Sequence, residues 1–281
     1  MKKIFGLVLA VSAMLFASCD NFEEDEYVVK LEGYTTESAP ITKTQTKQAV
    51  LLEDYTGWMC VNCPSAAALL ETMMTTYGED LVAMSVHAGS FANPSAANNN
   101  LDFRTTYGTQ WNSEFGFSAY PAGLINRTYN GSSRIFQKDE WNSAVASLLS
   151  SQTHYMNINL GAKISGKKII VSAQYAPVTN MDFPTYANIV VIESGIHGVQ
   201  FNSDPTYGSV PKIEDYVFNH VLRPNGLIAL PLAETMATGT NVENNYAINI
   251  DDAWVLGNCA VVVFVTNANT GEVVQVNEIE L

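Results

Sequence analysis

Two cysteines, Cys60 and Cys63, lie three positions apart in this chain of 281 residues. Cysteines at this spacing can close a disulfide over one turn of chain and exchange it with other thiols. A helix is expected to start beside them, and the unpaired N–H groups of a helix start favour a thiolate. We therefore expect redox chemistry, with Cys60 as the exposed nucleophile and Cys63 as the more buried resolving thiol.

The elements around the pair predict a strand, a helix and a second strand. Residues 49–52 form an apolar run, residues 64–77 carry apolar side chains at helical spacing, and residues 81–86 form another apolar run. This order within about 40 residues is typical of a βαβ unit with parallel strands and a right-handed crossover. The cysteine pair then lies between the first strand and the helix.

Five residues around the pair resemble the active-site segment of the thioredoxin superfamily: Leu52, Asp54, Trp58, Cys60 and Cys63. The resemblance implies that Asp54 is buried beneath the cysteines and assists proton transfer. It also implies that Pro121, after Tyr120, is the cis-proline that faces the pair. Two features depart from the pattern, because Trp58 lies two positions before Cys60 and the intervening dipeptide is Val61-Asn62.

The charges near the pair predict only a weakly activated thiol. No lysine or arginine lies between Lys47 and Arg104, so the helix start and His87 are the groups that could lower the pKa of Cys60. His87 ends the second predicted strand, and the carboxyl ends of parallel strands meet at one edge of a sheet. We expect a Cys60 pKa modestly below the ~8.5 of a free thiol, as in a reductant or mild exchanger.

Other interpretations of the pair stay open. The disulfide could be structural, or Cys60, Cys63 and His87 could bind Cu(I) and resemble copper-delivery proteins, whose cysteines have three intervening residues. A module that binds a protein or glycan, with no catalytic duty for the cysteines, is a further alternative.

No cofactor is expected, whether or not the chain is an enzyme. Cys259, in an apolar run, is expected to be a buried inert thiol.

The N-terminus predicts export and lipid attachment. Lys2 and Lys3 precede an apolar run of 13 residues, which is too short to span a bilayer. The sequence Ala17-Ser18-Cys19 that follows resembles the lipobox of bacterial lipoproteins. The resemblance implies that residues 1–18 are a signal peptide and that acylated Cys19 anchors the chain in a membrane. Residues 19–44 are expected to be an acidic and polar linker.

The net charge of the chain excludes a nucleic-acid partner, and a change in the pattern of apolar residues indicates two domains. The net charge of the chain is −14, and it is near −16 without residues 1–18, so a nucleic-acid partner is excluded. Apolar and polar residues alternate from about residue 154 onward, which predicts many short strands. The expected fold class is an α/β thioredoxin-like domain over residues 45–152, followed by an all-β, Ig-like sandwich over residues 153–281.

The chain as a whole resembles the family of twenty-eight-kilodalton outer membrane proteins. The resemblance rests on the N-terminal anchor and on two segments, residues 55–64 and residues 216–223. It implies an outer membrane lipoprotein, on the periplasmic face or the cell surface, with a thioredoxin-like domain before a β-sandwich. Its expected partners are the membrane, through Cys19, and protein thiols.

Overall fold

The computed structural model of the protein describes residues 33–281. The expected signal peptide, Cys19 and the first part of the expected linker lie outside the described residues. Within residues 33–281, no helix is both long enough and apolar enough to span a membrane.

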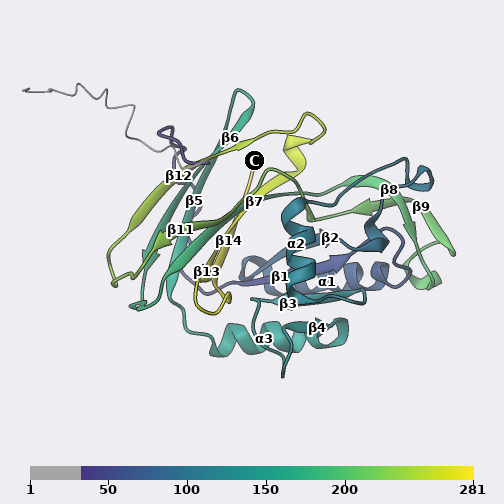
Figure 1. The fold of residues 1–281 in the computed structure, drawn as a ribbon, viewed down its shortest axis with the longest axis horizontal. Helices are drawn as coiled ribbons and strands as arrows, with labels where there is room; N and C mark the ends of the chain where they lie inside the picture. The colour runs from purple at the N-terminus through teal and green to yellow at the C-terminus, as the bar shows by residue number, and fades with distance from the viewer. Residues whose placement is uncertain (1–32) are drawn as a thin grey trace, which may run out of the picture. The chain divides into compact units, whose positions relative to one another are not determined.

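Strands dominate the described part of the chain, and a nine-stranded sheet is its largest element (Figure 1). Its order is β14-β13-β7-β10-β2-β1-β3-β4, and β11 also pairs with β7. The bounds are β1 (Val50–Thr56), β2 (Leu81–His87), β3 (Ala122–Ile125), β4 (Ile135–Gln137), β7 (Thr185–Glu193), β10 (Val221–Leu222), β11 (Leu227–Ala233), β13 (Cys259–Asn267) and β14 (Val273–Glu280).

Two smaller sheets and three α-helices complete the described elements. The three-stranded sheet has the order β12-β6-β5, and the two-stranded sheet pairs β8 with β9. Their bounds are β5 (Met156–Ser165), β6 (Lys168–Pro177), β8 (Ile196–Phe201), β9 (Lys212–Phe218) and β12 (Val242–Asn249). The helices are α1 (Cys63–Tyr77), α2 (Thr106–Phe115) and α3 (Trp141–Ser151).

The predicted βαβ unit is present. β1 and β2 run parallel, from the pair Val50 and Leu81 to the pair Thr56 and His87, with α1 between them in sequence. Every residue of both strands is buried, which explains their unbroken apolar runs. One face of the two strands packs on α1, where Ala66, Leu70 and Met73 follow helical spacing.

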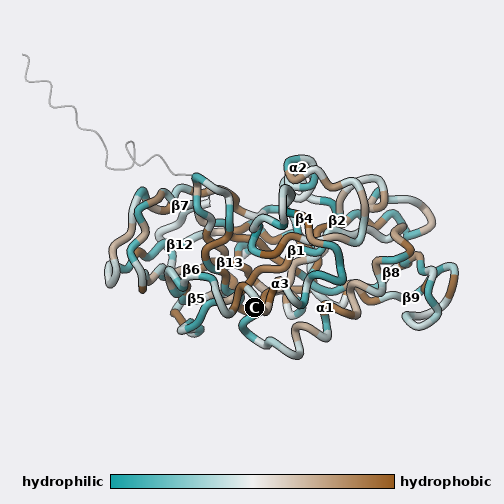
Figure 2. Tube along the Cα trace, turned by 90° about the horizontal axis from the view of Figure 1, so that it is seen from below, coloured by the Kyte–Doolittle hydropathy of each residue, from teal (hydrophilic) through white to brown (hydrophobic). Residues whose placement is uncertain are grey.

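The opposite face of β1 and β2 packs against α2 and against strands from the C-terminal half of the chain. Tyr55 and Met84 share this core with Trp111 of α2 and with Val262 and Phe264 of β13. Figure 2 shows the most hydrophobic colour along the central strands, including β1 and β13. The core on this face of β1 and β2 is therefore built by residues far apart in sequence.

A second core lies between β12-β6-β5 and the end of the large sheet formed by β7, β13 and β14. Alternate residues of β5 such as Ile158 and Leu160 are fully buried, as the predicted alternation requires. Tyr175 and Tyr246 meet inside this core, with their hydroxyl oxygens 2.9 Å apart.

One sheet runs through both halves of the chain. The short strand β10 pairs with β7 on one side and, through Val221 and Ser85, with β2 on the other. The domain boundary at residues 152 and 153 stays a prediction.

Several expected boundaries were wrong. The sequence pattern of residues 216–222 predicts one strand, but these residues are divided between β9 and β10, because His220 adopts a left-handed backbone with φ +55°. The strands β4, β8 and β11 were not anticipated. The sequence pattern also predicts a helix from Lys138 to Ser150, whereas Lys138–Glu140 form a short 3-10 helix and α3 begins at Trp141.

Candidate functional site

Cys60 and Cys63 form a disulfide, with their Cα atoms 5.4 Å apart. After β1 ends at Thr56, a tight turn brings Cys60 N to donate to Gly57 O at 2.9 Å. α1 begins at Cys63, so Cys60 lies before the helix and Cys63 is its first residue. Both cysteines are only 3% exposed, and the expectation of an exposed Cys60 is wrong for the disulfide form.

A distant hairpin, residues 196–218, makes hydrogen bonds with the cysteine turn, and we call it the strap. It consists of β8, β9 and the loop between them. Phe201 N donates to Trp58 O at 2.8 Å, and Ser203 N donates to Val61 O at 3.0 Å. The buried Gln200 side chain donates from Nε2 to Cys60 O at 2.9 Å.

Residues 91–93 hold the cysteine turn from another direction. Met59 N donates to Phe91 O at 3.1 Å, and the Trp58 indole donates to Asn93 O at 2.7 Å. A Cβ atom at Gly57 would lie 2.6 Å from the Phe91 backbone, so only glycine fits there. The turn is thus held by two separate segments of chain, the strap and residues 91–93.

A cavity of about 30 Å³ lies behind Cys63. Asp54 and His87 line it from β1 and β2, and Tyr216 and Asn219 line it from the strap and the residue after it. Asp54 Oδ1 and His87 Nδ1 are buried without a hydrogen-bond partner among the described residues. A cavity of this size has room for a water molecule, which would need such polar partners.

Burial shifts the two titratable groups of this cavity in opposite directions. It raises the pKa of Asp54 to about 7, because the charged carboxylate is disfavoured away from water. It lowers the pKa of His87 to about 3, and the charge of Arg223 lowers it further, against a smaller opposite effect of Asp102. Near neutral pH the imidazole is uncharged and Asp54 titrates.

One cation does lie close to the start of α1, contrary to the expectation from sequence. Lys138 Nζ donates to Ser65 Oγ at 2.9 Å, and Ser65 is two residues after Cys63. Lys138 is outside the stretch that lacks cations, so spacing along the chain could not reveal this contact.

Pro121 directly precedes β3, and its peptide bond with Tyr120 is cis. In β3, Ala122 pairs with Tyr55 of β1, so Pro121 lies level with the end of β1, from which the cysteine turn starts.

The alternative copper site is not supported. Within residues 33–281, no group of three or more His, Cys, Asp or Glu side chains is arranged to hold a metal ion. His87 is instead enclosed by aromatic rings, with Phe103 at 5.0 Å and Phe218 at 5.5 Å between ring centroids. Cys259 is a buried free thiol, as expected, and burial raises its pKa to about 12.

Sequence reasoning missed the residues that close the site from the C-terminal half. Gln200 had no recognisable motif, and residues 216–223 were noted as a strand and a family-like segment but not as part of the site. The structure places that segment on the site, because Tyr216, Phe218 and Asn219 line the cavity and Ser85 N donates to His220 O at 2.7 Å. The family-like segment was thus the one available signal.

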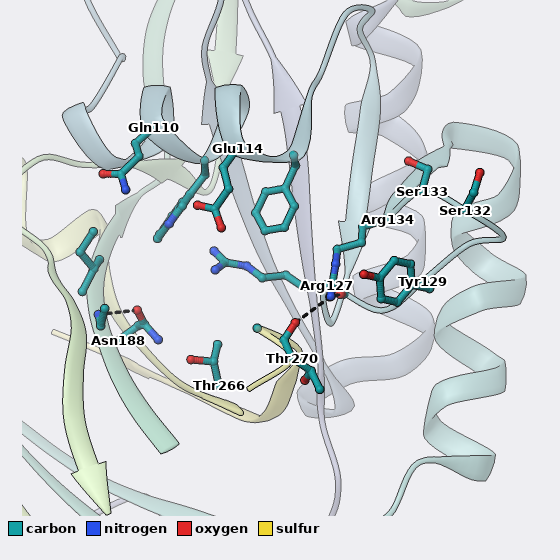
Figure 3. Close-up of a pocket in the computed structure, with 15 residues that line it drawn as sticks. Gln110, Glu114, Arg127, Tyr129, Ser132, Ser133, Arg134, Asn188, Thr266 and Thr270 are labelled. Atoms are coloured by element: carbon teal, nitrogen blue, oxygen red, sulfur yellow. Dashed lines mark hydrogen bonds between the residues drawn. The ribbon is translucent and has the colours of Figure 1, made fainter. Parts of the chain in front are cut away.

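A larger cavity, of about 500 Å³, lies elsewhere and is lined by neither cysteine of the pair (Figure 3). Arg127 reaches into it while its guanidinium makes two 2.8 Å hydrogen bonds with buried Glu53 and lies 4.4 Å from the Trp111 ring. Arg134 donates to the carbonyls of Arg127 and Thr270. Both arginines are thus engaged with protein groups, and we assign no ligand to this cavity.

Comparisons with known proteins agree with the β-rich fold of the described residues. A family model described as outer membrane protein Omp28 matches residues 108–281. The chain belongs to this family and is an outer membrane protein. The matched range begins after the cysteine pair, so membership by itself assigns no role to Cys60 and Cys63. A comparison with curated proteins gave no match.

Solved structures include similar folds at low sequence identity. HBP35 of Porphyromonas gingivalis matches with a TM-score of 0.62 and 15% identity, over 85% of this chain and 77% of its own. A protein from Agrobacterium tumefaciens matches with a TM-score of 0.50 and 14% identity, over 84% and 96%. A domain of the outer membrane lipoprotein Omp28 from P. gingivalis gives 0.27 and 16%, over 47% and 92%.

Proposed function

We propose that this outer membrane protein is a lipid-anchored, extracytoplasmic thiol–disulfide exchange protein. The observation that carries the proposal is the disulfide at the first turn of α1, with a buried acid, Asp54, lining the cavity behind Cys63. Its substrates would be dithiols or disulfides of partner proteins. No cofactor is needed, because the pair itself accepts or donates the two electrons.

In this proposal, residues 45–152 form a thioredoxin-like domain and residues 153–281 an Ig-like sandwich. Support for the first comes from the strand order β2-β1-β3-β4, with β1 and β2 parallel and β3 and β4 antiparallel to their neighbours. Support for the second comes from the core that β12-β6-β5 shares with β7, β13 and β14. Pro121 would face the bound partner from the start of β3.

With a partner dithiol, the exchange takes place in two steps. A partner thiolate attacks the sulfur of Cys60, the Cys60–Cys63 bond breaks, and Cys63 leaves as a thiolate that takes up a proton. The partner's second thiolate then attacks the partner sulfur that is bonded to Cys60 in the mixed disulfide. This closes the partner's disulfide and releases Cys60 as a thiolate, which takes up a proton. The partner gains a disulfide and loses two electrons and two protons, and the cysteine pair gains both. The reverse sequence reduces a partner disulfide.

Asp54 would supply the proton to Cys63. Since burial raises the pKa of Asp54 to about 7, the carboxyl still holds a proton in much of the protein at neutral pH. Asp54 and Cys63 line the same cavity, and a water there could connect them.

The experiment is a measurement of the reduction potential of the pair in glutathione buffers, with Cys259→Ser as a control that removes the other described thiol. We expect a potential between about −270 and −180 mV, the range of exchange proteins. A value below about −300 mV would instead indicate a structural disulfide.

A non-catalytic disulfide in a binding protein is the second candidate, and one observation favours it. Both cysteines are only 3% exposed, whereas exchange requires access to one sulfur. The potential separates the two candidates.

The lipid anchor has its own test. Replacing Cys19 with Ala should release the protein from the membrane fraction, because acyl chains on Cys19 would attach it. Unchanged fractionation of Cys19→Ala with membranes would contradict the anchor.

A further inference from the structure

We infer that the strap, residues 196–218, is a built-in cover that must open before the Cys60–Cys63 disulfide meets a partner. The inference rests on the proposed exchange function and adds a control on access to it.

The strap donates hydrogen bonds to the backbone carbonyl groups around Cys60 with which a partner chain would pair. Trp58 O and Val61 O accept from Phe201 N and Ser203 N, and Cys60 O accepts from Gln200 Nε2. The backbone acceptors on both sides of Cys60 are thus satisfied within the chain. An approaching segment cannot pair with the cysteine turn until residues 200–203 move away.

The strap also packs apolar side chains against the cysteine turn. Phe201 meets the Trp58 ring edge-on at 5.2 Å between centroids, and Phe218 and Val199 join Trp58 in one apolar cluster. Gln200 itself is 2% exposed. These contacts lie against the turn that carries Cys60, and we attribute part of the low exposure of Cys60 to them.

The strap is built as a separable unit. β8 and β9 pair with each other, and neither is part of the nine-stranded sheet. Residues with left-handed backbones flank it, Gly195 with φ +72° just before the strap and His220 with φ +55° two residues after it. A hairpin joined to its surroundings mainly by side chains and a few hydrogen bonds can open locally while the sheets stay folded.

The geometry selects an extended protein segment as the partner. Such a segment carries backbone N–H donors at the spacing of Phe201 and Ser203, so it can replace them on Trp58 O and Val61 O, as in strand addition. A cysteine of that segment would then lie beside Cys60. A partner that supplies these hydrogen bonds compensates for opening the strap, whereas a small thiol does not.

The test measures how fast dithiothreitol reduces the pair in the full chain. One thiolate of the reductant attacks a sulfur of the pair, the second closes the cyclic disulfide, and two electrons pass to Cys60 and Cys63. The variants are Gln200→Ala and Phe201→Ala, singly and combined. The matched control is Val217→Thr, on the same hairpin at a side chain that is 43% exposed. A synthetic peptide of residues 57–66 with the same disulfide supplies the uncovered reference rate.

We expect wild type to react at least about tenfold more slowly than the peptide, because reaction needs the opened state. The combined variant should recover most of that difference, and Val217→Thr should react like wild type. Hydrogen exchange should show faster opening of residues 199–203 with unchanged protection of β13, which excludes general unfolding. Wild-type reduction as fast as the peptide, or no acceleration in the combined variant, would overturn the cover.

The two hypotheses can fail separately. If dithiothreitol reduces wild type as fast as the peptide, but the reduction potential is typical of exchange proteins, the strap is not a cover and the proposed exchange function still stands. If the strap variants are reduced faster than wild type, but the reduction potential is typical of structural disulfides, the strap is a cover and the proposed exchange function is wrong.

Discussion

Asp54 and His87 line one small cavity from adjacent parallel strands, and burial keeps both uncharged over a shared pH range. The register pairs Asp54 with Ser85 and Thr56 with His87, so the two side chains lie on the same face of the sheet. This face also carries Val50 and Leu52, which pack on α1. The cavity is therefore the polar end of an apolar interface.

This relationship predicts an unusual pH dependence of stability. Between pH 3.8 and about 7, folded Asp54 keeps a proton that the unfolded chain has released, so its contribution lowers stability as pH rises. Between about pH 3 and 6.5, folded His87 lacks a proton that the unfolded chain binds, so its contribution raises stability as pH rises. The two contributions oppose each other between about pH 4 and 6.5.

Asp54→Asn should remove the contribution of Asp54 to the pH dependence of stability and leave the opposing contribution of His87. Relative to wild type, the variant's free energy of unfolding should gain a positive slope of about 1.4 kcal/mol per pH unit between about pH 4 and 6.5. Urea unfolding at fixed pH values measures this difference, in which all other groups cancel. His87→Gln should change the slope in the opposite direction, and equal slopes in all three proteins would contradict the pKa shifts.

The pH profile of exchange provides a second prediction. If Asp54 delivers the proton to Cys63, the rate of exchange with a dithiol should show an inflection near pH 7, where Asp54 titrates. Asp54→Asn should lose this inflection, while Asp252→Asn, which changes an exposed carboxylate, should keep it. An unaltered profile in Asp54→Asn would exclude Asp54 as the proton donor.

The reactivity of Cys60 after reduction is a third prediction. In Cys63→Ser, alkylation across pH should give a Cys60 pKa modestly below the ~8.5 of a free thiol. An ionised Asp54 opposes the thiolate, whereas the start of α1 and Lys138 favour it. Cys259 should stay unreactive, because burial raises its pKa to about 12. A Cys60 pKa near 4 would indicate a strong oxidant instead.

Local patterns predicted the local parts of the site. The spacing of Cys60 and Cys63 and the parallel strands on either side follow from residues within one βαβ unit, where apolar runs and helical spacing are strong signals. The burial of Asp54 was expected only from the resemblance to the thioredoxin superfamily, and Asp54 is buried. The alternation in β5 likewise fixed its buried face. These features depend on neighbours in sequence, which a pattern can record.

The cover over the site depends on contacts between distant residues, and no local pattern encodes them. Gln200 reaches Cys60 across 140 positions, and β8, which carries it, lacked a recognisable strand signal. Lys138 reaches Ser65 across 73 positions. The exposure of Cys60 was therefore mispredicted, because the helix start alone suggests an open thiol and only the tertiary fold adds the strap.

A buried ion pair on the opposite face of β1 provides the last prediction. Glu53 is fully buried and makes two 2.8 Å hydrogen bonds with Arg127, whose side chain is 7% exposed. Glu53→Gln should lower the free energy of unfolding by about 3–5 kcal/mol, because it leaves the Arg127 charge buried without a counter-ion. Asp252→Asn, which breaks the exposed pair with Lys167, should cost no more than about 1 kcal/mol.

A double variant separates the charge from the packing at this pair. Glu53→Gln combined with Arg127→Met removes both charges and keeps most of the side-chain volume against Trp111 and Phe264. Urea unfolding should show the double variant to be more stable than Glu53→Gln alone, since no unpaired charge remains buried. If the two substitutions simply add, the loss in Glu53→Gln comes from packing, and the ion-pair explanation is wrong.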